Sequence, residues 1–145
     1  MKRFVLLFVV VANLLLVDAI TKELAAGYLN GSAAISVIDG FFSLTYVENR
    51  GCAWGLLQGH VWPLAVIGIL ALALLVWKRK SIFPSFLSEA LLEAGILGNL
   101  IDRIVRGYVI DFIDLHYQDV YHFPCFNVAD TCITIAAILI ILKKR

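Results

Sequence analysis

Four stretches of this chain are almost entirely apolar, and polar segments separate them. A helix that crosses a bilayer needs about 17–25 predominantly apolar residues. The four stretches are close to that length, so the pattern predicts an all-α membrane protein with four transmembrane helices and both termini on one side. The expected spans are residues 4–22, 61–77, 86–105 and 126–142, within a single integral membrane domain, residues 1–145.

The third stretch is the least apolar of the four. Gly95, Asn99, Asp102, Arg103 and Arg106 recur there at helical spacing, which places them on one face of the helix. Ionisable residues inside a span are costly and usually mark function, and a glycine allows a helix or a substrate to approach closely. This face is either part of a binding site or a polar seam that holds the bundle together.

Basic residues predict the orientation of the spans. Eight of the twelve Lys and Arg residues mark the N-terminus, the second connection and the C-terminus: Lys2, Arg3, Lys78, Arg79, Lys80, Lys143, Lys144 and Arg145. The positive-inside rule makes these three regions cytoplasmic. Residues 27–60 and 107–125 are then extracytoplasmic. The remaining Lys22, Arg50, Arg103 and Arg106 lie near that outer side and require a different explanation.

The first outer segment contains a predicted β-hairpin over residues 35–47. Apolar and polar residues alternate from Phe42 to Tyr46, which is typical of a half-buried strand. Asp39-Gly40 supplies the turn. We therefore expect a small extracytoplasmic hairpin or sheet beside the helices.

Composition supports the membrane class and excludes one class of partner. The chain is 61% hydrophobic and 16% charged, against about 45–50% apolar and about 25% charged in soluble domains. Membrane lipids are therefore expected partners. The net charge of +1 provides no basic field for nucleic acid.

The first apolar stretch has a second interpretation. Lys2-Arg3 followed by a short apolar run is also the pattern of a cleaved signal peptide. No Ala-x-Ala site follows, and Asp18 and Lys22 come directly after the run. We therefore favour a retained span.

Two aspartates are the candidate catalytic pair. Asp111 is flanked by Ile110 and Phe112, and desolvation by such neighbours raises a carboxyl pKa. Asp130 lies three residues after Asn127, at the capping-box position of the fourth helix. Two carboxylates that share a proton suit the activation of water for amide hydrolysis. The alternatives are a loop carboxylate at the membrane surface and a simple helix cap.

Two further groups support a site at the outer end. Asp18 and Lys22 are four residues apart, so they share a helix face and can pair. The segment Asn49-Arg50-Gly51-Cys52-Ala53-Trp54-Gly55 combines small residues, which suit a tight backbone beside a ligand, with an amide that can donate and accept. An interfacial ion pair and an ordinary turn are the respective alternatives.

The histidines and cysteines carry weaker signals. His60, His116 and His122 with Asp111, Asp114 and Asp119 have no ligand spacing typical of a metal site. Cys52, Cys125 and Cys132 have no CxxC spacing. We therefore expect no metal site among these residues. A Cys52–Cys125 disulfide remains open, because both residues lie in outer segments.

Four motifs, in order, resemble those of the bacterial lipoprotein signal peptidases (signal peptidase II) over nearly the full length. They are Asp18-Ala-Ile-Thr-Lys22, Asn49-Arg-Gly-Cys-Ala-Trp-Gly55, Gly95-Ile-Leu-Gly-Asn-Leu-Ile-Asp-Arg103 with Val109-Ile-Asp-Phe112, and Phe126-Asn-Val-Ala-Asp130. The resemblance implies an aspartyl endopeptidase of the bacterial cytoplasmic (inner) membrane. Its active site would face the extracytoplasmic side. Its substrates would be prolipoproteins carrying diacylglycerol on a cysteine, cut just before that cysteine.

The resemblance also assigns roles to residues. It implies that Asp111 and Asp130 are catalytic, and that Asp18 and Lys22 are a supporting pair. The implied substrate-binding residues are Asn49, Gly51, Gly95, Asn99, Asp102, Arg103, Asn127 and Ala129. One chain holds the whole set, so we expect an active monomer.

Two positions depart from the family pattern, and one other class competes. Cys52 and Glu93 stand where smaller residues are common. A thiol protease through Cys52 has no suitably placed histidine to support it. The competing class is a small membrane transporter or assembly factor that uses the polar seam. A conduction path needs polar residues along its whole length, whereas here they concentrate toward the outer ends.

Overall fold

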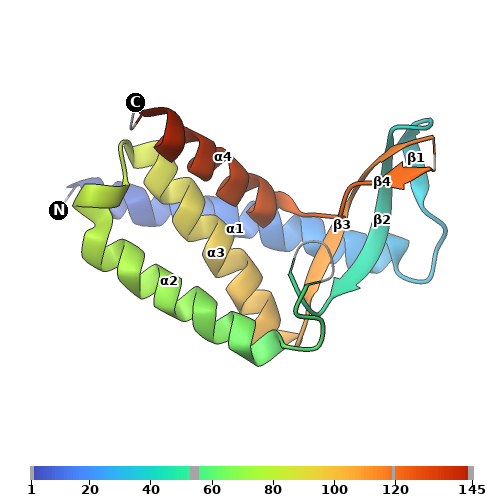
Figure 1. The fold of residues 1–145 in the computed structure, drawn as a ribbon, viewed down its shortest axis with the longest axis horizontal. Coiled ribbons are helices and arrows are strands. Elements are labelled where there is room, and N and C mark those ends of the chain that lie inside the picture. Colours follow the sequence, from blue (N-terminus) through green and yellow to red (C-terminus); the bar gives the residue numbers. More distant parts are fainter. Residues whose placement is uncertain (1, 53–55, 119, 144–145) are drawn as a thin grey trace.

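The computed structural model describes residues 2–52, 56–118 and 120–143, so residues 1, 53–55, 119 and 144–145 lie outside the description. The described residues form four helices and four strands (Figure 1). The helices are α1 (Lys2–Leu29), α2 (Val61–Ile82), α3 (Phe86–Val105) and α4 (Val128–Lys143). The strands are β1 (Ile35–Ile38), β2 (Phe42–Asn49), β3 (Val109–Tyr117) and β4 (Tyr121–His122). The predicted combination of four helices and a small sheet is confirmed.

The helices and the sheet occupy opposite ends of the molecule. Figure 1 shows both termini and the α2–α3 connection at one end, which we call the terminal end, and the sheet at the other, the sheet end. The described basic residues Lys2, Arg3, Lys78, Arg79, Lys80 and Lys143 belong to the terminal end. Lys144 and Arg145, which the orientation argument also used, lie outside the described residues.

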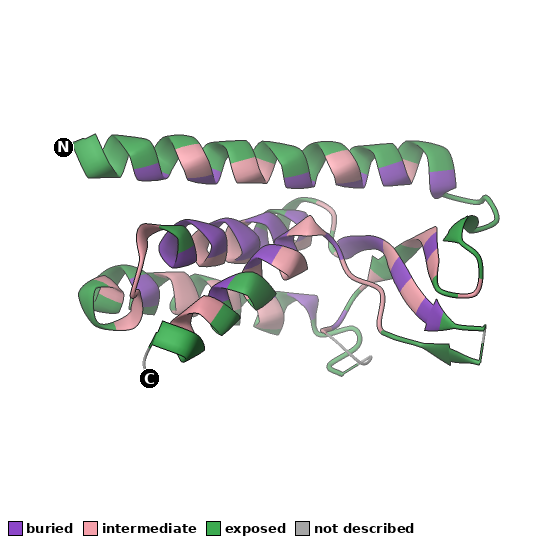
Figure 2. Cartoon of the chain, turned by 90° about the horizontal axis from the view of Figure 1, so that it is seen from above, coloured by how far each residue is buried: buried purple, intermediate pink, exposed green. Residues whose placement is uncertain are grey.

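Helix α3 is the centre of the bundle and packs against α1, α2 and α4. It begins at Ser85, whose hydroxyl accepts a hydrogen bond from the Ser88 N–H in a capping box. Its small residues let α1 approach closely, since Ala90 and Ala94 pack with Leu7 and Val11 in one core cluster. Figure 2 shows this helix largely buried, whereas the buried residues of α1 follow one side of that helix.

The outer faces of the helices are apolar and exposed. Phe8 on α1 and Trp77 on α2 are each 75% exposed, as expected for side chains that contact lipid. Among the described residues, α1 and α2 have the length and apolar composition of a membrane-crossing helix. Helix α3 does not meet this criterion because it carries several ionisable residues, and α4 does not meet it because it has 16 residues. Two of the four predicted spans thus meet that criterion.

Three helices, α1, α2 and α4, have bounds that differ from the expected spans. Helix α1 continues to Leu29, because Ala25 and Leu29 pack against Ile110 and Phe112 of β3. Helix α2 continues to Ile82 and so includes Lys78, Arg79 and Lys80. Helix α4 begins two residues later than expected, at Val128, after its cap.

The sheet is antiparallel, with strand order β1-β2-β3-β4. The predicted hairpin is confirmed, and Gly40 in its turn has φ +71°, which favours glycine. A bulge between Leu44 and Val47 interrupts the β2–β3 register before the Val47–Asp111 pair. Strand β3 was not anticipated, and it places Asp111 on a rigid element at the centre of the sheet.

The sequence also did not predict a buried ionic cluster at the terminal end. The Glu89 side chain is fully buried. Its Oε2 accepts from Arg3 Nη2 at 2.9 Å, and its Oε1 accepts from Arg79 Nε at 2.8 Å. We call Arg3, Arg79 and Glu89 the terminal cluster. The two arginines therefore neutralise a buried carboxylate, in addition to any role in orientation.

Candidate active site

The two predicted aspartates come together from different elements. Residues alternate along β3, so Ile110 and Phe112 pack toward α1 in a core cluster while Asp111 faces the other side of the strand. Asp130 lies in the first turn of α4. Both carboxylates line the same cavity.

Amide groups hold Asp111 from both sides. Its Oδ2 accepts from Asn49 Nδ2 at 2.9 Å, and its Oδ1 accepts from Asn127 Nδ2 at 2.7 Å. Burial, with the negative charge of Asp130 nearby, raises the pKa of the Asp111 carboxyl from 3.8 to about 7, although these two N–H groups act in the opposite direction. A carboxyl with that pKa can hold a proton near neutral pH.

Asp130 is both a member of the capping box of its helix, with Asn127 as the N-cap, and a cavity residue. The Asp130 N–H donates to Asn127 Oδ1 at 2.9 Å, and Asp130 Oδ2 accepts from the Asn127 N–H at 3.3 Å. This is the predicted capping box. Asp130 Oδ1 also accepts from Asn99 Nδ2 at 2.7 Å. The helix N-terminus favours negative charge at this carboxylate.

Asn127 and Asn99 connect the two carboxylates. Asn127 Nδ2 reaches both Asp111 Oδ1, at 2.7 Å, and Asn99 Oδ1, at 3.1 Å. Asn99 in turn donates to Asp130. The two asparagines therefore fix the carboxylates relative to each other across β3, α3 and α4.

A buried ion network lies behind these asparagines. Lys22 Nζ is 2.7 Å from Asp18 Oδ2, 3.0 Å from Asp102 Oδ2 and 3.1 Å from Asn99 Oδ1. Asp18 Oδ1 accepts from the Ala129 N–H at 2.9 Å, which satisfies a free donor at the start of α4. The predicted Asp18–Lys22 pair thus links α1 to α3 and α4.

The network continues to the surface through Asp102. Asp102 Oδ1 accepts from Arg106 Nε at 3.1 Å, and Arg106 also pairs with Glu23. We call Asp18, Lys22, Glu23, Asp102 and Arg106 the sheet-end network.

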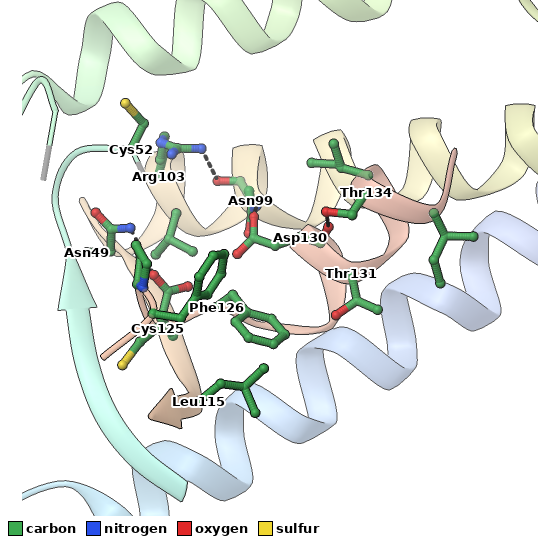
Figure 3. A pocket seen from close by; sticks show the side chains of 16 residues that line it. Asn49, Cys52, Asn99, Arg103, Leu115, Cys125, Phe126, Asp130, Thr131 and Thr134 are labelled. Atoms are coloured by element: carbon green, nitrogen blue, oxygen red, sulfur yellow. Dashed lines mark hydrogen bonds between the residues drawn. The ribbon is translucent and has the colours of Figure 1, made fainter. Parts of the chain in front are cut away.

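The carboxylates open into an apolar cavity of about 490 Å³. Figure 3 shows Asn49, Asn99 and Asp130 reaching it from three different elements. Its apolar walls include Leu115, Phe123, Pro124, Phe126, Ile133 and Ile135. A second recess of about 270 Å³ lies between α2, α3 and α4 and shares Asn99, Arg103 and Asp130 with the cavity. The polar groups therefore stand where two apolar recesses meet.

The predicted substrate-binding residues divide into two sets. Asn49, Asn99 and Arg103 line the cavity with the aspartates. The described lining of the cavity does not include the other five predicted residues, which are Gly51, Gly95, Asp102, Asn127 and Ala129. They shape the site from behind, together with Asp18 and Lys22.

Two of the glycines permit close backbone contacts. A Cβ on Gly95 would stand 2.5 Å from the Ala129 carbonyl oxygen, and a Cβ on Gly51 would stand 2.5 Å from the Leu56 carbonyl oxygen. Both distances are shorter than normal contacts. Arg103 Nη2 also donates to the Gly51 carbonyl oxygen at 3.1 Å, which ties the outer loop to α3. Ala53, Trp54 and Gly55 of the same motif lie outside the described residues.

Gly98 is a site residue that the sequence did not single out. A Cβ there would stand 2.7 Å from Asp18 Oδ2 and 3.2 Å from the Ala129 Cβ. The absence of a side chain makes room for the Asp18 carboxylate. Its position three residues after Gly95 on the polar face was the available signal.

The chain matches the family model of signal peptidase (SPase) II over residues 10–144. The chain belongs to the signal peptidase II family. The lipoprotein signal peptidase of Clostridium acetobutylicum is 42% identical over 136 residues, which cover 90% of this chain and 88% of the relative. That of Syntrophus aciditrophicus is 40% identical, over 98% and 94% of the two chains.

Solved structures support the same assignment. A bacterial membrane enzyme determined by the in meso method has a TM-score of 0.79 and 35% identity to this signal peptidase II family member, over 94% of this chain and 90% of that one. The family is one of aspartic-type peptidases. Membership therefore decides against the transporter and assembly-factor alternative.

The other chemical alternatives find no support in the geometry. Cys52, Cys125 and Cys132 are free thiols, so Cys52 and Cys125 form no disulfide. Burial raises the pKa of the Cys125 thiol to about 11, which keeps it protonated. Within residues 2–52, 56–118 and 120–143, no three His, Cys, Asp or Glu side chains are grouped to hold a metal ion. Asp119 lies outside that description.

Proposed function

We propose that this chain removes the signal peptide from prolipoproteins that carry diacylglycerol on a cysteine, cleaving just before that cysteine with water activated by Asp111 and Asp130. Family membership supports the reaction. The observation that carries the assignment is the joint exposure of two amide-held carboxylates to one apolar cavity. The apolar walls suit a substrate with acyl chains and an apolar signal peptide.

In this mechanism Asp130 begins as the base and Asp111 as the acid. Asp130 takes a proton from water, and the resulting hydroxide attacks the scissile carbonyl carbon. Asp111 donates its proton to the carbonyl oxygen, which gives a neutral tetrahedral diol. Asp130 then passes its proton to the amine as the C–N bond breaks, and Asp111 takes back a hydroxyl proton as the carbonyl group re-forms. The α4 N-terminus supports an ionised Asp130, while burial keeps Asp111 protonated. The pair titrates as a unit, so we expect a bell-shaped pH–rate profile.

The surrounding residues bind and orient the substrate. Asn49, Asn99 and Arg103 reach the cavity and offer donors for the substrate backbone and the lipid ester groups. Gly51, Gly95, Asp102, Asn127 and Ala129 keep these side chains in place through the contacts described above. Asp18 and Lys22 support α4 and Asn99. The reaction as proposed uses no metal and no organic cofactor.

The membrane placement follows from the two ends of the molecule. All four helices cross the bacterial cytoplasmic membrane, with the basic terminal end in the cytoplasm. The sheet end, with the carboxylates, faces the extracytoplasmic side. Apart from Lys143 at the terminal end, the ionisable residues of α3 and α4 are buried or half-buried against the bundle, which reduces the cost of placing them in the membrane. One chain supplies the whole site, so the active form is a monomer.

The decisive test is cleavage of a diacylglyceryl-modified prolipoprotein by purified protein in detergent. We expect Asp111→Asn and Asp130→Asn to fold and to lose at least about 10³-fold in kcat, because general acid–base groups contribute about 10²–10⁴-fold each. Asp114→Asn is a matched control on the same strand, since Asp114 contacts His122 and does not line the cavity among its described residues.

Three results would contradict the proposal. A folded Asp111→Asn or Asp130→Asn variant with near-normal activity would make that aspartate structural. An Asp114→Asn variant as inactive as the other two would show that any charge lost from β3 stops the reaction. A folded wild type that cuts nothing would remove the proposed reaction itself.

A further inference from the structure

Lys22 is the most completely enclosed cation of the described chain. Its side chain is 1% exposed. An ammonium group has three N–H donors, and Nζ has three acceptors in reach: Asp18 Oδ2, Asp102 Oδ2 and Asn99 Oδ1. Burying a charge in this way is expensive unless it is fully paired. A purely structural lysine would use the same three acceptors, so a functional role depends on what the Asn99 amide contacts next.

The contact with Asn99 determines which way that amide points. Because an ammonium can only donate, the oxygen of the Asn99 side chain must face Lys22. The amide nitrogen then faces Asp130, and Asn99 Nδ2 donates to Asp130 Oδ1 at 2.7 Å. Without the cation, only the Asn127 Nδ2 contact at 3.1 Å still orients the Asn99 oxygen, so the amide turns more readily and can present its oxygen, which would require a proton on Asp130.

The charges around the pair are balanced. Apart from Asp111 and Asp130, the charged groups that the described helices bring to this region are Asp18, Lys22 and Glu23 from α1 and Asp102, Arg103 and Arg106 from α3. These helices therefore contribute three negative and three positive charges. On β3, Asp114 contacts His122. At the rim, Arg50 pairs with Glu48 of β2, and Cys52 lies near Arg103. The aspartate pair with one shared proton therefore contributes the single unbalanced charge.

We propose that Lys22 is a positioning residue that acts through Asn99 to keep one proton, and only one, on the Asp111–Asp130 pair at neutral pH. The inference rests on the proposed function. Loss of the cation leaves the region one charge more negative and removes one of the two donors that orient the Asn99 amide, so the pair retains its protons to higher pH. Burial raises the pKa of Asp111, and the charge of Lys22 acts in the opposite direction.

The test compares pH–rate profiles of three variants on the same lipidated substrate. Lys22→Met keeps the length of the side chain and removes the charge. We expect both limbs of its kcat profile to move up by about one pH unit, since a charge within about 4–6 Å shifts a carboxyl by 1–3 units and Lys22 acts through an intervening amide. At pH 7 we expect about a tenfold loss of kcat with little change in KM.

Asp18→Asn and the double variant separate charge from packing. The asparagine retains an oxygen for the Ala129 N–H, and the loss of a negative charge moves both limbs down. In Lys22→Met/Asp18→Asn the charge balance is restored, so the limbs return to within about 0.3 unit of wild type. A purely structural role for Lys22 predicts instead that the double variant is the most impaired of the three.

The outcomes distinguish this inference from the proposed function. Wild type that cuts the substrate, with a folded Lys22→Met variant whose limbs do not move, overturns the role of Lys22 and leaves the reaction intact. If Lys22→Met does not fold, Asp18→Asn decides alone: a downward shift supports the inference, and no shift or an upward shift overturns it. A wild type that cuts nothing refutes the proposed function instead.

Discussion

The two ends of α3 bury charge in different ways. At the terminal end, Glu89 has both oxygens occupied by Arg3 and Arg79, and neither of the two described recesses includes Glu89. At the sheet end, Asp102 belongs to a network in which Lys22 also reaches Asn99, and Asn99 reaches Asp130 beside an open cavity. The terminal cluster is closed on itself, whereas the sheet-end network continues to the candidate catalytic pair.

This difference shows what separates a structural buried charge from a functional one. Both sites desolvate a carboxylate, so burial alone does not distinguish them. The sheet end adds two features: a second carboxylate, whose charge adds to burial in raising the pKa of Asp111 to about 7, and an apolar cavity that both carboxylates line. Like charges held together near a cleft are typical of acid–base catalysis.

The largest effect should follow from disturbing α3 at the sheet end. In Gly95→Ala, the new Cβ would stand 2.5 Å from the Ala129 carbonyl oxygen, so α3 and α4 must separate. We expect a loss of about 1–3 kcal/mol in unfolding free energy. Activity should fall by about 10²-fold, because Asn99 and Asp130 lie on the two displaced helices. Thermal unfolding and the cleavage rate in detergent measure the two effects.

Gly68→Ala is the matched control for that substitution. Gly68 lies on α2 and also faces α3, but its Cβ would meet its nearest atom, Leu100 Cδ1, at 3.6 Å, an ordinary contact. The control should retain stability and activity. Equal losses in both variants would show that any added methyl group at a helix contact is disruptive, and would remove the special role of the α3–α4 approach.

The sequence predicted the sheet end better than the terminal end, for a physical reason. Asp130 and Asn127 interact over three residues, so local spacing was sufficient to predict the capping box, and the structure has it. Glu89 and Arg3 are 86 residues apart, and nothing in local periodicity joins them. The contact between Lys22 and Asn99 spans 77 residues and was equally inaccessible.

The same limit explains the errors in the elements. Helix α1 continues past its apolar stretch because Ala25 and Leu29 pack on β3, which is a tertiary contact. The four-residue spacing of Asp18 and Lys22 predicted that the two residues pair, and the structure confirms it. That spacing could not predict that the pair also contacts α3 and α4. Gly98 makes room for Asp18, and that is visible only once α1 and α3 are packed together.

An intermediate effect is expected at the terminal cluster. Glu89→Gln removes the negative charge that Arg3 and Arg79 share. Breaking a fully buried pair costs about 3–5 kcal/mol, but the Arg3 side chain is 64% exposed and stays hydrated, so we expect about 1–3 kcal/mol. The folded fraction should cleave substrate at the wild-type rate, with an unchanged pH profile. Loss of activity at matched folding would contradict a closed, structural cluster.

The smallest effect should be a change in pH dependence at the sheet end. Burial and the charge of Asp130 raise the pKa of Asp111 to about 7, and the Asn49 N–H opposes that rise by stabilising the ionised carboxylate. Asn49→Ala removes the opposition, so the pKa of Asp111 rises further. The proposed acid stays protonated to higher pH, and the basic limb of the kcat profile should move up by about half a unit.

The control for that shift is an amide far from the pair. Asn13 on α1 is exposed and donates to the Val9 carbonyl oxygen, so Asn13→Ala should leave both limbs in place. An upward shift of the acidic limb in Asn49→Ala, with the basic limb in place, would mean that Asp111 acts as the ionised partner, and the acid and base roles would then be exchanged. Two unmoved limbs would mean that Asn49 serves substrate binding without tuning the pair. Either result would sharpen the contrast with Glu89, whose two oxygens are occupied by Arg3 and Arg79 and which lines neither described recess.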